Sequence, residues 1–454
     1  MILAALVALS LTVPDKKVPA DTRHGSHLRE SRRLGGRSGT PQPPVFRFAP
    51  STGAGMTEEC ACTSPTGTRG EALTFARASS AMCTKGNEWS LIDNGDLALC
   101  TTDQPRVMRG GTGTGAKGLM VESARTNVLL RSQELDDAAW GNSGTAPVIR
   151  ANHGVAPDGT TTAEAIQFFA VGGGGESSKF QSGLGTLSPG ACSVYLKAAP
   201  PADGGVAVAG SIDMAAGAAA NPCVTCSYTT DTWTRCTLTG NTSTYVFIGN
   251  ESAGACAAGA RTEQNVYVWG VQCEAGDYTS SYIPTTNATA TRAQEDATFT
   301  LANTYSSGTG FSISAKMTLN GAASATTSGP VSIGQDATNN MRSALATSST
   351  IGTCGYLSTG GNGTSSATGV PLFKDGDNRR ICTWTGSTTT TRQSTYNGVA
   401  GTATVQAASS AWNWGGVKLQ GEYTDASFGA TRRRPDGVVK EVCVHNAPTK
   451  CQDL

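Results

Sequence analysis

The sequence is poor in charge and lacks long apolar runs. Charged residues make up 15% of its 454 residues, against an average of about 25%. Lys+Arg and Asp+Glu both total 34, so no net charge draws the protein to nucleic acid or to an anionic membrane. No run approaches the ~18–20 apolar residues that a membrane span requires. We therefore expect no nucleic-acid partner and no membrane span.

Histidine, the commonest general base, is also scarce. His24 and His27 lie in a polar N-terminal stretch, His153 beside Gly154 in an expected loop, and His445 on the polar side of an expected strand. No Gly-x-Ser-x-Gly elbow, Walker loop or His-Glu-x-x-His helix occurs. The Glu-x-Asp-x-x-Glu pattern of sandwich glucanases, which supplies their two carboxylates, is missing too. We therefore predict no catalytic residue and no enzyme.

Glycine is abundant, with 56 residues, and short β-branched or aromatic runs lie between glycine-rich turns. Residues 193–198, 244–248 and 265–269 are such runs. Residues 311–319 alternate apolar and polar side chains, which is typical of a strand with one buried face. These patterns, without helical segments between them, predict an all-β protein built of tandem antiparallel β-sandwiches.

Four segments follow from the composition. Residues 1–45 begin with an apolar stretch, Ile2 to Val13, and continue as a basic, Pro- and Gly-rich linker that we expect to be disordered. The start is typical of a secretory signal, but no Lys or Arg precedes it, so an apolar beginning of the tail is the alternative. Residues 46–120 predict a short β-rich segment. Two sandwich domains are expected at 121–297 and 298–454.

Each of the last three segments contains an even number of the 14 cysteines, so each can pair its cysteines internally. They are Cys60, Cys62, Cys83 and Cys100, then Cys192, Cys223, Cys226, Cys236, Cys256 and Cys273, then Cys354, Cys382, Cys443 and Cys451. Zinc is the competing use, but the one CxxC has no second half at a suitable distance. We predict that at least four of these cysteines form structural disulfides, which favours an oxidising, extracellular setting.

Several motifs occur together in a recognisable order. They are GLMVESARTNVLL at 118–130, DAAW at 137–140, APDGTTTA at 156–163, SVYLKA at 193–198, QCEAG at 272–276, SYIPTT at 281–286 and TRA at 291–293. Residues 70–297 thereby resemble a family of phage tail and head-fibre proteins and bacterial surface proteins. The resemblance implies a jelly-roll like that of carbohydrate-binding modules. Residues 298–454 resemble the concanavalin A-like or laminin G-like sandwich that often follows it.

Two clusters in the last segment are candidate ligand sites. Trp412, Asn413 and Trp414 supply two rings and an amide beside a glycine-rich boundary, as in sites where aromatic rings stack on sugars. The alternative is that both tryptophans are core residues. Asp375, Asp377 and Asn378 place oxygen ligands in an expected turn, as a structural Ca²⁺ site would, although an ordinary polar turn is the alternative. No other cofactor is predicted.

The function predicted from these observations is non-enzymatic glycan binding or adhesion, outside the cell or on a virion surface. Extracellular or cell-surface glycans are the expected partners, with other virion or surface proteins as a second class. The alternative is a structural or decoration protein whose sandwiches bind no sugar. A glycan-active hydrolase is the weakest alternative.

Overall fold

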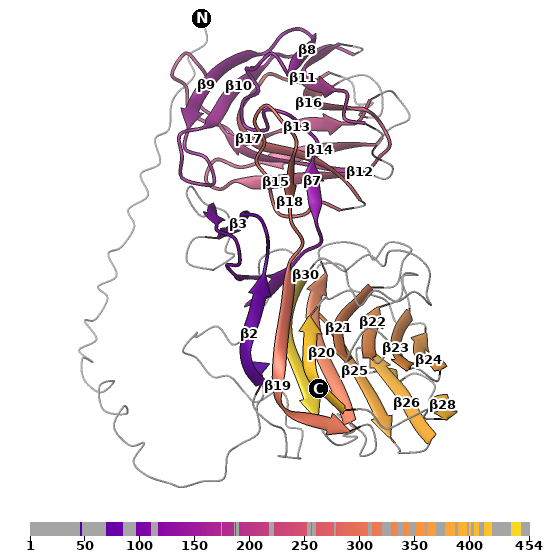
Figure 1. The fold of residues 1–454 in the computed structure, drawn as a ribbon. Helices are drawn as coiled ribbons and strands as arrows, with labels where there is room; N and C mark the ends of the chain where they lie inside the picture. Colours follow the sequence, from indigo (N-terminus) through magenta and orange to yellow (C-terminus); the bar gives the residue numbers. More distant parts are fainter. Residues whose placement is uncertain are drawn as a thin grey trace, which may run out of the picture. The chain divides into compact units, whose positions relative to one another are not determined.

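The computed structural model describes most of the chain from residue 70 onward (Figure 1). The described residues are 46–47, 70–84, 97–109, 117–306 and the strands between 311 and 445. Within 117–306, residues 174, 186, 188–189, 218–221, 252–255, 257–259 and 277 are left out. Side chains are described within 75–83, 97–106 and 119–297, with the same exceptions. Every strand pair in these residues is antiparallel, which confirms the all-β prediction. None of the described residues belongs to a helix long and apolar enough to cross a membrane. The predicted disordered linker within 1–45 lies outside the described residues.

Two five-stranded sheets face each other between residues 141 and 275 (Figure 1). The first, here the β12 sheet, has the order β15 (Thr234–Asn241), β12 (Gly190–Ala198), β17 (Gln264–Ala275), β10 (Ala163–Phe168) and β9 (Val148–Gly154). The second, here the β16 sheet, has the order β14 (Cys223–Tyr228), β13 (Gly210–Ala215), β16 (Tyr245–Glu251), β11 (Glu176–Ser182) and β8 (Gly141–Gly144). β9 contains His153, so the expectation of a loop there is wrong.

The core of this sandwich lies between the two sheets because each strand buries alternate side chains. Val194 and Leu196 of β12 and Val246 and Ile248 of β16 are completely buried in one apolar cluster. Trp140, Trp233 and Trp269 are also buried, in or beside the motifs of the family resemblance. They therefore pack within the fold and do not form a surface platform.

Four disulfides are present among the described residues, which confirms the prediction of at least four bonded cysteines. They are Cys83–Cys100, Cys192–Cys273, Cys223–Cys256 and Cys226–Cys236. Cys226–Cys236 connects β14 of one sheet to β15 of the other. The six remaining cysteines, Cys60, Cys62, Cys354, Cys382, Cys443 and Cys451, lie outside the residues whose side chains are described.

Two larger sheets contain the strands after residue 295, together with strands from before residue 122. One has the order β27 (Val399–Ala400), β26 (Thr389–Tyr396), β25 (Asp377–Thr385), β20 (Phe311–Leu319), β30 (Gly437–His445), β6 (Lys117–Val121) and β5 (Arg106–Arg109), with β1 (Phe46–Arg47) on β30 and β28 (Thr404–Ala407) on β26. The other has the order β2 (Gly70–Ala76), β19 (Asp296–Ser306), β29 (Asn413–Leu419), β21 (Ser328–Gly334), β22 (Asn340–Leu345), β23 (Ile351–Ser358) and β24 (Gly361–Thr368). β1, β2 and β6, which precede residue 122, thus pair with strands of the last segment.

Two short pairs complete the described strands. β7 (Arg125–Asn127) pairs with β18 (Ala290–Arg292). β3 (Ala81–Thr84) pairs with β4 (Leu97–Cys100) in a hairpin closed by Cys83–Cys100. Met82 and Leu97 of this hairpin join an apolar cluster that also contains Trp269 of β17. The hairpin therefore packs on the outer face of the β12 sheet.

Candidate functional site

The outer face of the β16 sheet carries aromatic side chains as well as polar ones. In β16, Val246 and Ile248 point into the core, so Tyr245 and Phe247 point to the opposite face. Phe180 of β11 lies directly across from Phe247 in the register of the two strands and therefore shares that face. The three rings are outside the core cluster.

Tyr245, Phe247 and Phe180 form a continuous row, here the aromatic row. The ring centroids of Phe180 and Phe247 are 5.5 Å apart with planes 27° from parallel, and those of Tyr245 and Phe247 are 6.4 Å apart with planes at 22°. Tyr245 is 42% exposed and the two phenylalanines are half-buried. A Cβ atom at Gly141 of β8 would lie 2.6 Å from the Phe180 ring, so glycine at this position makes room for that ring.

Carboxyl and hydroxyl groups lie beside the aromatic row, on β16, β11 and β8. Glu251 of β16 lies directly across from Glu176 of β11. Ser178 Oγ donates to Glu251 Oε1 at 3.0 Å, and Ser143 Oγ donates to Glu176 Oε1. Glu176 and Ser143 are half-buried, whereas Glu251 is almost fully buried. The face thus combines partly exposed rings with partly exposed hydrogen-bonding groups.

The surroundings of Glu251 favour the protonated form of its carboxyl group. Burial raises the pKa of Glu251 to about 7, and the negative charge of Glu176 beside it adds to the rise. The two carboxyl groups are hydrogen-bonded to each other, which relieves the repulsion expected of like charges directly opposite on neighbouring strands. At neutral pH the pair therefore carries less than its full two negative charges.

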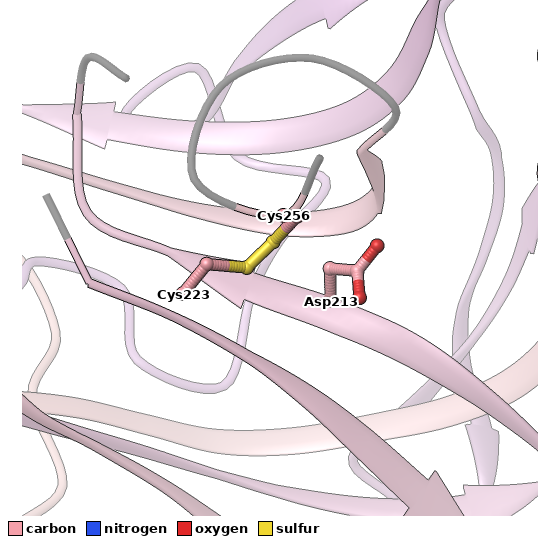
Figure 2. A group of neighbouring side chains, drawn as sticks. All are labelled: Asp213, Cys223 and Cys256. Carbon is pink, nitrogen blue, oxygen red and sulfur yellow. A yellow bond between two sulfur atoms is a disulfide. The ribbon is translucent and has the colours of Figure 1, made fainter. Parts of the chain in front are cut away.

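Asp213 lies near the Cys223–Cys256 disulfide, as Figure 2 shows. Its neighbours Ile212 and Met214 point into the core, so Asp213 points to the outer face of the β16 sheet. One carboxylate oxygen of Asp213 and the two sulfur atoms lie within 4.8 Å of one another, a grouping that could bind a metal ion if the sulfurs were thiolates. They are bonded to each other, and Asp213 Oδ1 already accepts from Thr225 Oγ1 at 2.8 Å and from Arg261 Nη2 at 2.9 Å. With the disulfide intact, this group ties Cys256 to β14 and holds no metal.

The tryptophan cluster predicted as a glycan site falls mostly outside the described side chains. Trp412 is outside the described residues, and Asn413 and Trp414 are the first two residues of β29. The backbone pairs Trp414 with Tyr305 of β19. The assignment of a sugar site to these residues stays a prediction.

The side chains of the predicted Ca²⁺ ligands also lie outside the described part of the structure. Asp377 and Asn378 are the first two residues of β25, where they pair with β20. Asp375 lies outside the described residues. The side chains of all three are undescribed, so Ca²⁺ binding stays a prediction.

The aromatic row was missed by the sequence reasoning, although a signal for it is present. Residues 244–248 predict a strand, and within it Tyr245 and Phe247 alternate with Val246 and Ile248. Both faces of this strand are therefore apolar, whereas a strand covering a core with its other face in water alternates apolar and polar residues. A second apolar face indicates a second contact surface.

Comparisons with known proteins give little guidance. No protein-family profile and no curated protein matches the chain. One similar solved structure is the N-terminal CBM22-1-CBM22-2 tandem domain of Xyn10C from Paenibacillus barcinonensis, a pair of carbohydrate-binding modules. The identity is 9%, the TM-score is 0.23, and the match covers 72% of this chain and 99% of that one. A likeness this weak does not enter the functional argument.

Proposed function

We propose that the protein binds glycans without cleaving them, and that the aromatic row is its saccharide platform. The observation that carries the proposal is that three near-parallel rings lie on one sheet face beside Glu176 and Ser143. Sugar rings have apolar faces that pack on aromatic rings, and their hydroxyl groups need hydrogen-bond partners at the edge of the contact. The outer face of the β16 sheet offers both.

The carboxyl pair beside the row supports binding without hydrolysis. A glycosidase needs two carboxyl groups about 5–5.5 Å or about 6.5–9.5 Å apart, with the glycosidic bond between them. Glu176 and Glu251 are hydrogen-bonded to each other, and Glu251 is only 6% exposed. A sugar linkage has no space between these two groups.

An extracellular or virion-surface location belongs to the same proposal. The four disulfides are compatible with it, because disulfides persist in oxidising surroundings and are rare in the cytosol. The phage-fibre and surface-protein resemblance, the adhesive role and the second sugar site at Trp412, Asn413 and Trp414 are further parts of the proposal. Glycans at a cell surface are the proposed partners.

The test is glycan-array binding by the full chain, followed by titration of the best saccharide. Replacing Phe247 or Phe180 by alanine should weaken binding by about 1–3 kcal/mol, the value of burying a large apolar side chain. Val148→Ala is the matched control, because Val148 is an exposed apolar residue on the other sheet. Melting temperature and circular dichroism would establish that each variant is folded.

The outcomes separate the alternatives. Unchanged binding in folded Phe247→Ala and Phe180→Ala variants would remove the aromatic row from the site. If Trp414→Ala then abolished binding, the sugar site would lie in the last segment. A full chain that binds no saccharide on the array would favour the structural or decoration protein.

A further inference from the structure

The outer face of the β12 sheet carries a row of residues that includes two cations and a tyrosine. Lys197 of β12 pairs with Tyr267 of β17, Tyr267 pairs with Ala165 of β10, and Ala165 pairs with Arg150 of β9. Residues in register on neighbouring strands point to the same face. Val266 and Val268 point into the core, so Tyr267 and its row point outward. A tyrosine therefore lies between two cationic residues on the outer face.

Two further aromatic rings, those of His153 and Trp233, lie close to the Tyr267 ring. The His153 ring is nearly parallel to the Tyr267 ring, with centroids 6.2 Å apart and planes at 25°. The buried Trp233 ring packs against Tyr267, with ring centroids 6.4 Å apart and planes at 44°, and helps to hold it in place. A Cβ atom at Gly154 would lie 2.5 Å from the Tyr267 ring, so glycine makes room for it. His153 is exposed and Tyr267 is half-buried, so a ligand can reach both.

Two cationic residues, Lys197 and Arg150, belong to this row. Arg150 Nη2 donates to the carbonyl oxygen of Pro200 at 2.5 Å, and Nη1 lies 3.3 Å from His153 Nε2. Neither partner is a carboxylate. Glu263, directly before β17, accepts from the side-chain amide of Asn265 at 3.2 Å. The row therefore differs from the aromatic row, whose neighbours are carboxyl groups.

We propose that Lys197, Tyr267, Arg150 and His153 form a second binding surface, specific for a chain of uronic acid units. Sugar rings would pack on Tyr267 and His153, and carboxylates would pair with Lys197 and Arg150. The two cations are three strand spacings apart, about 14 Å at the usual distance between strands. A saccharide lying across the strands, with a carboxylate on each unit, meets both cations. Neutral saccharides have no carboxylates to pair with Lys197 and Arg150.

The site is independent of the aromatic row, and the experiment keeps the two apart. Binding of an oligogalacturonate hexamer to the full chain is compared with binding of its methyl ester, which has the same sugar backbone without the charges. We expect the acid to bind, with an affinity that falls as salt is raised, and the ester to bind at least severalfold more weakly. Equal binding of the two, or no binding of the acid, would overturn the proposal.

Variants locate the site. Lys197→Gln and Arg150→Gln should each weaken binding of the acid about two- to fivefold, the range of partly exposed ion pairs. Arg131→Gln is the matched control, since Arg131 is already paired with Glu134 and Asp137. Gly154→Ala should weaken binding with both charges intact, by displacing the Tyr267 ring. Unchanged affinity in the folded Lys197→Gln/Arg150→Gln double variant would contradict the assignment.

The aromatic-row variant distinguishes failure of this proposal from failure of the proposed function. Phe247→Ala should leave binding of the oligogalacturonate unchanged, because Phe247 lies on the other sheet. A loss of acid binding in Phe247→Ala would place the acidic saccharide on the aromatic row and overturn the second site. Loss of neutral-sugar binding alone would support two separate surfaces.

Discussion

Arg106 and Glu295 form a two-point ion pair, in which Nε and Nη2 of the guanidinium donate to Oε1 and Oε2 of the carboxylate, both at 2.7 Å. Glu122 accepts from the same guanidinium at 2.6 Å, and Arg77 and Arg292 pair with Glu295 and Glu122. All five side chains are buried. Arg106 begins β5 and Arg292 ends β18. Arg77 and Glu122 directly follow β2 and β6, and Glu295 directly precedes β19, so the network brings together residues far apart in the sequence.

At Arg106 and Glu122 the ion pairs outweigh the effect of burial on the pKa, whereas at Arg77 burial outweighs them and lowers the pKa. Burial alone would lower the pKa of Arg106, but the charges of Glu295 and Glu122 raise it. Burial alone would raise the pKa of Glu122, but Arg292 and Arg106 hold it well below its ordinary value. Glu122 therefore depends on its two arginine partners to remain charged inside the fold.

Replacing Arg106 by methionine should destabilise the protein by about 3–5 kcal/mol, because two buried carboxylates would lose their shared cation. Chemical denaturation followed by fluorescence measures the change. Arg131→Met is the control, since Arg131 forms partly exposed pairs worth at most about 1 kcal/mol. Equal losses in the two variants would show that the buried network has no special role in stability.

Stability should fall as pH rises through the range in which Glu251 titrates. The ordinary pKa of this carboxyl is 4.5, and burial together with Glu176 raises it to about 7 in the folded protein. Between these values the folded state keeps a proton that the unfolded state has released, so each rise in pH favours unfolding. The contribution is fully present below about pH 4.5 and lost by about pH 7, and amounts to at most about 3 kcal/mol.

Urea unfolding of Glu251→Gln and the wild type from pH 4 to pH 9 tests this prediction. The variant should lose part of the downward slope between about pH 4.5 and 7 and gain relative stability above it. Glu134→Gln is the control, since its side chain is 43% exposed. The same slope in Glu251→Gln and the wild type would contradict the assignment of the proton.

The disulfides should differ in their contribution to stability. Cys192–Cys273 closes a loop with a sequence separation of 81, and Cys226–Cys236 one of 10. The chain-entropy relation gives about 4–5 kcal/mol for the first and about 2.5–3 kcal/mol for the second. Denaturation of the two double-alanine variants measures the difference. A larger loss for Cys226/Cys236 would mean that its link between the two sheets outweighs the loop entropy.

Replacing Trp412 or Trp414 by alanine has two opposite expected results, depending on whether the ring binds sugar or packs in the core. If Trp412 or Trp414 stacks on sugar, its replacement by alanine should weaken binding by about 1–3 kcal/mol with little change in melting temperature. If both are core residues, truncation should cost about 3–5 kcal/mol of stability instead. Glycan binding measured beside thermal unfolding separates the cases. A lowered melting temperature with unchanged binding would exclude the site.

Local patterns in the sequence were enough to predict several of the strands, although not β9, where a loop was expected at His153. The alternation at 311–319 matches β20, and the runs at 193–198 and 265–269 lie within β12 and β17. The pattern is local because side chains alternate between the two faces of a strand, so it can be recognised without knowing the partner strand. The even cysteine counts likewise predicted pairing within segments, and the described disulfides follow it.

Only the tertiary structure shows which strands pair with one another. β2 pairs with β19 and β6 with β30, across hundreds of residues, and no local pattern specifies such a pairing. The surfaces depend on the same choice, because Phe180 meets Phe247 and Lys197 meets Tyr267 only in one register of neighbouring strands. A shift of one residue would turn these side chains to the other face. The sequence by itself determined strands such as β12, β17 and β20, because alternation is local, while long-range register decided which side chains share a surface.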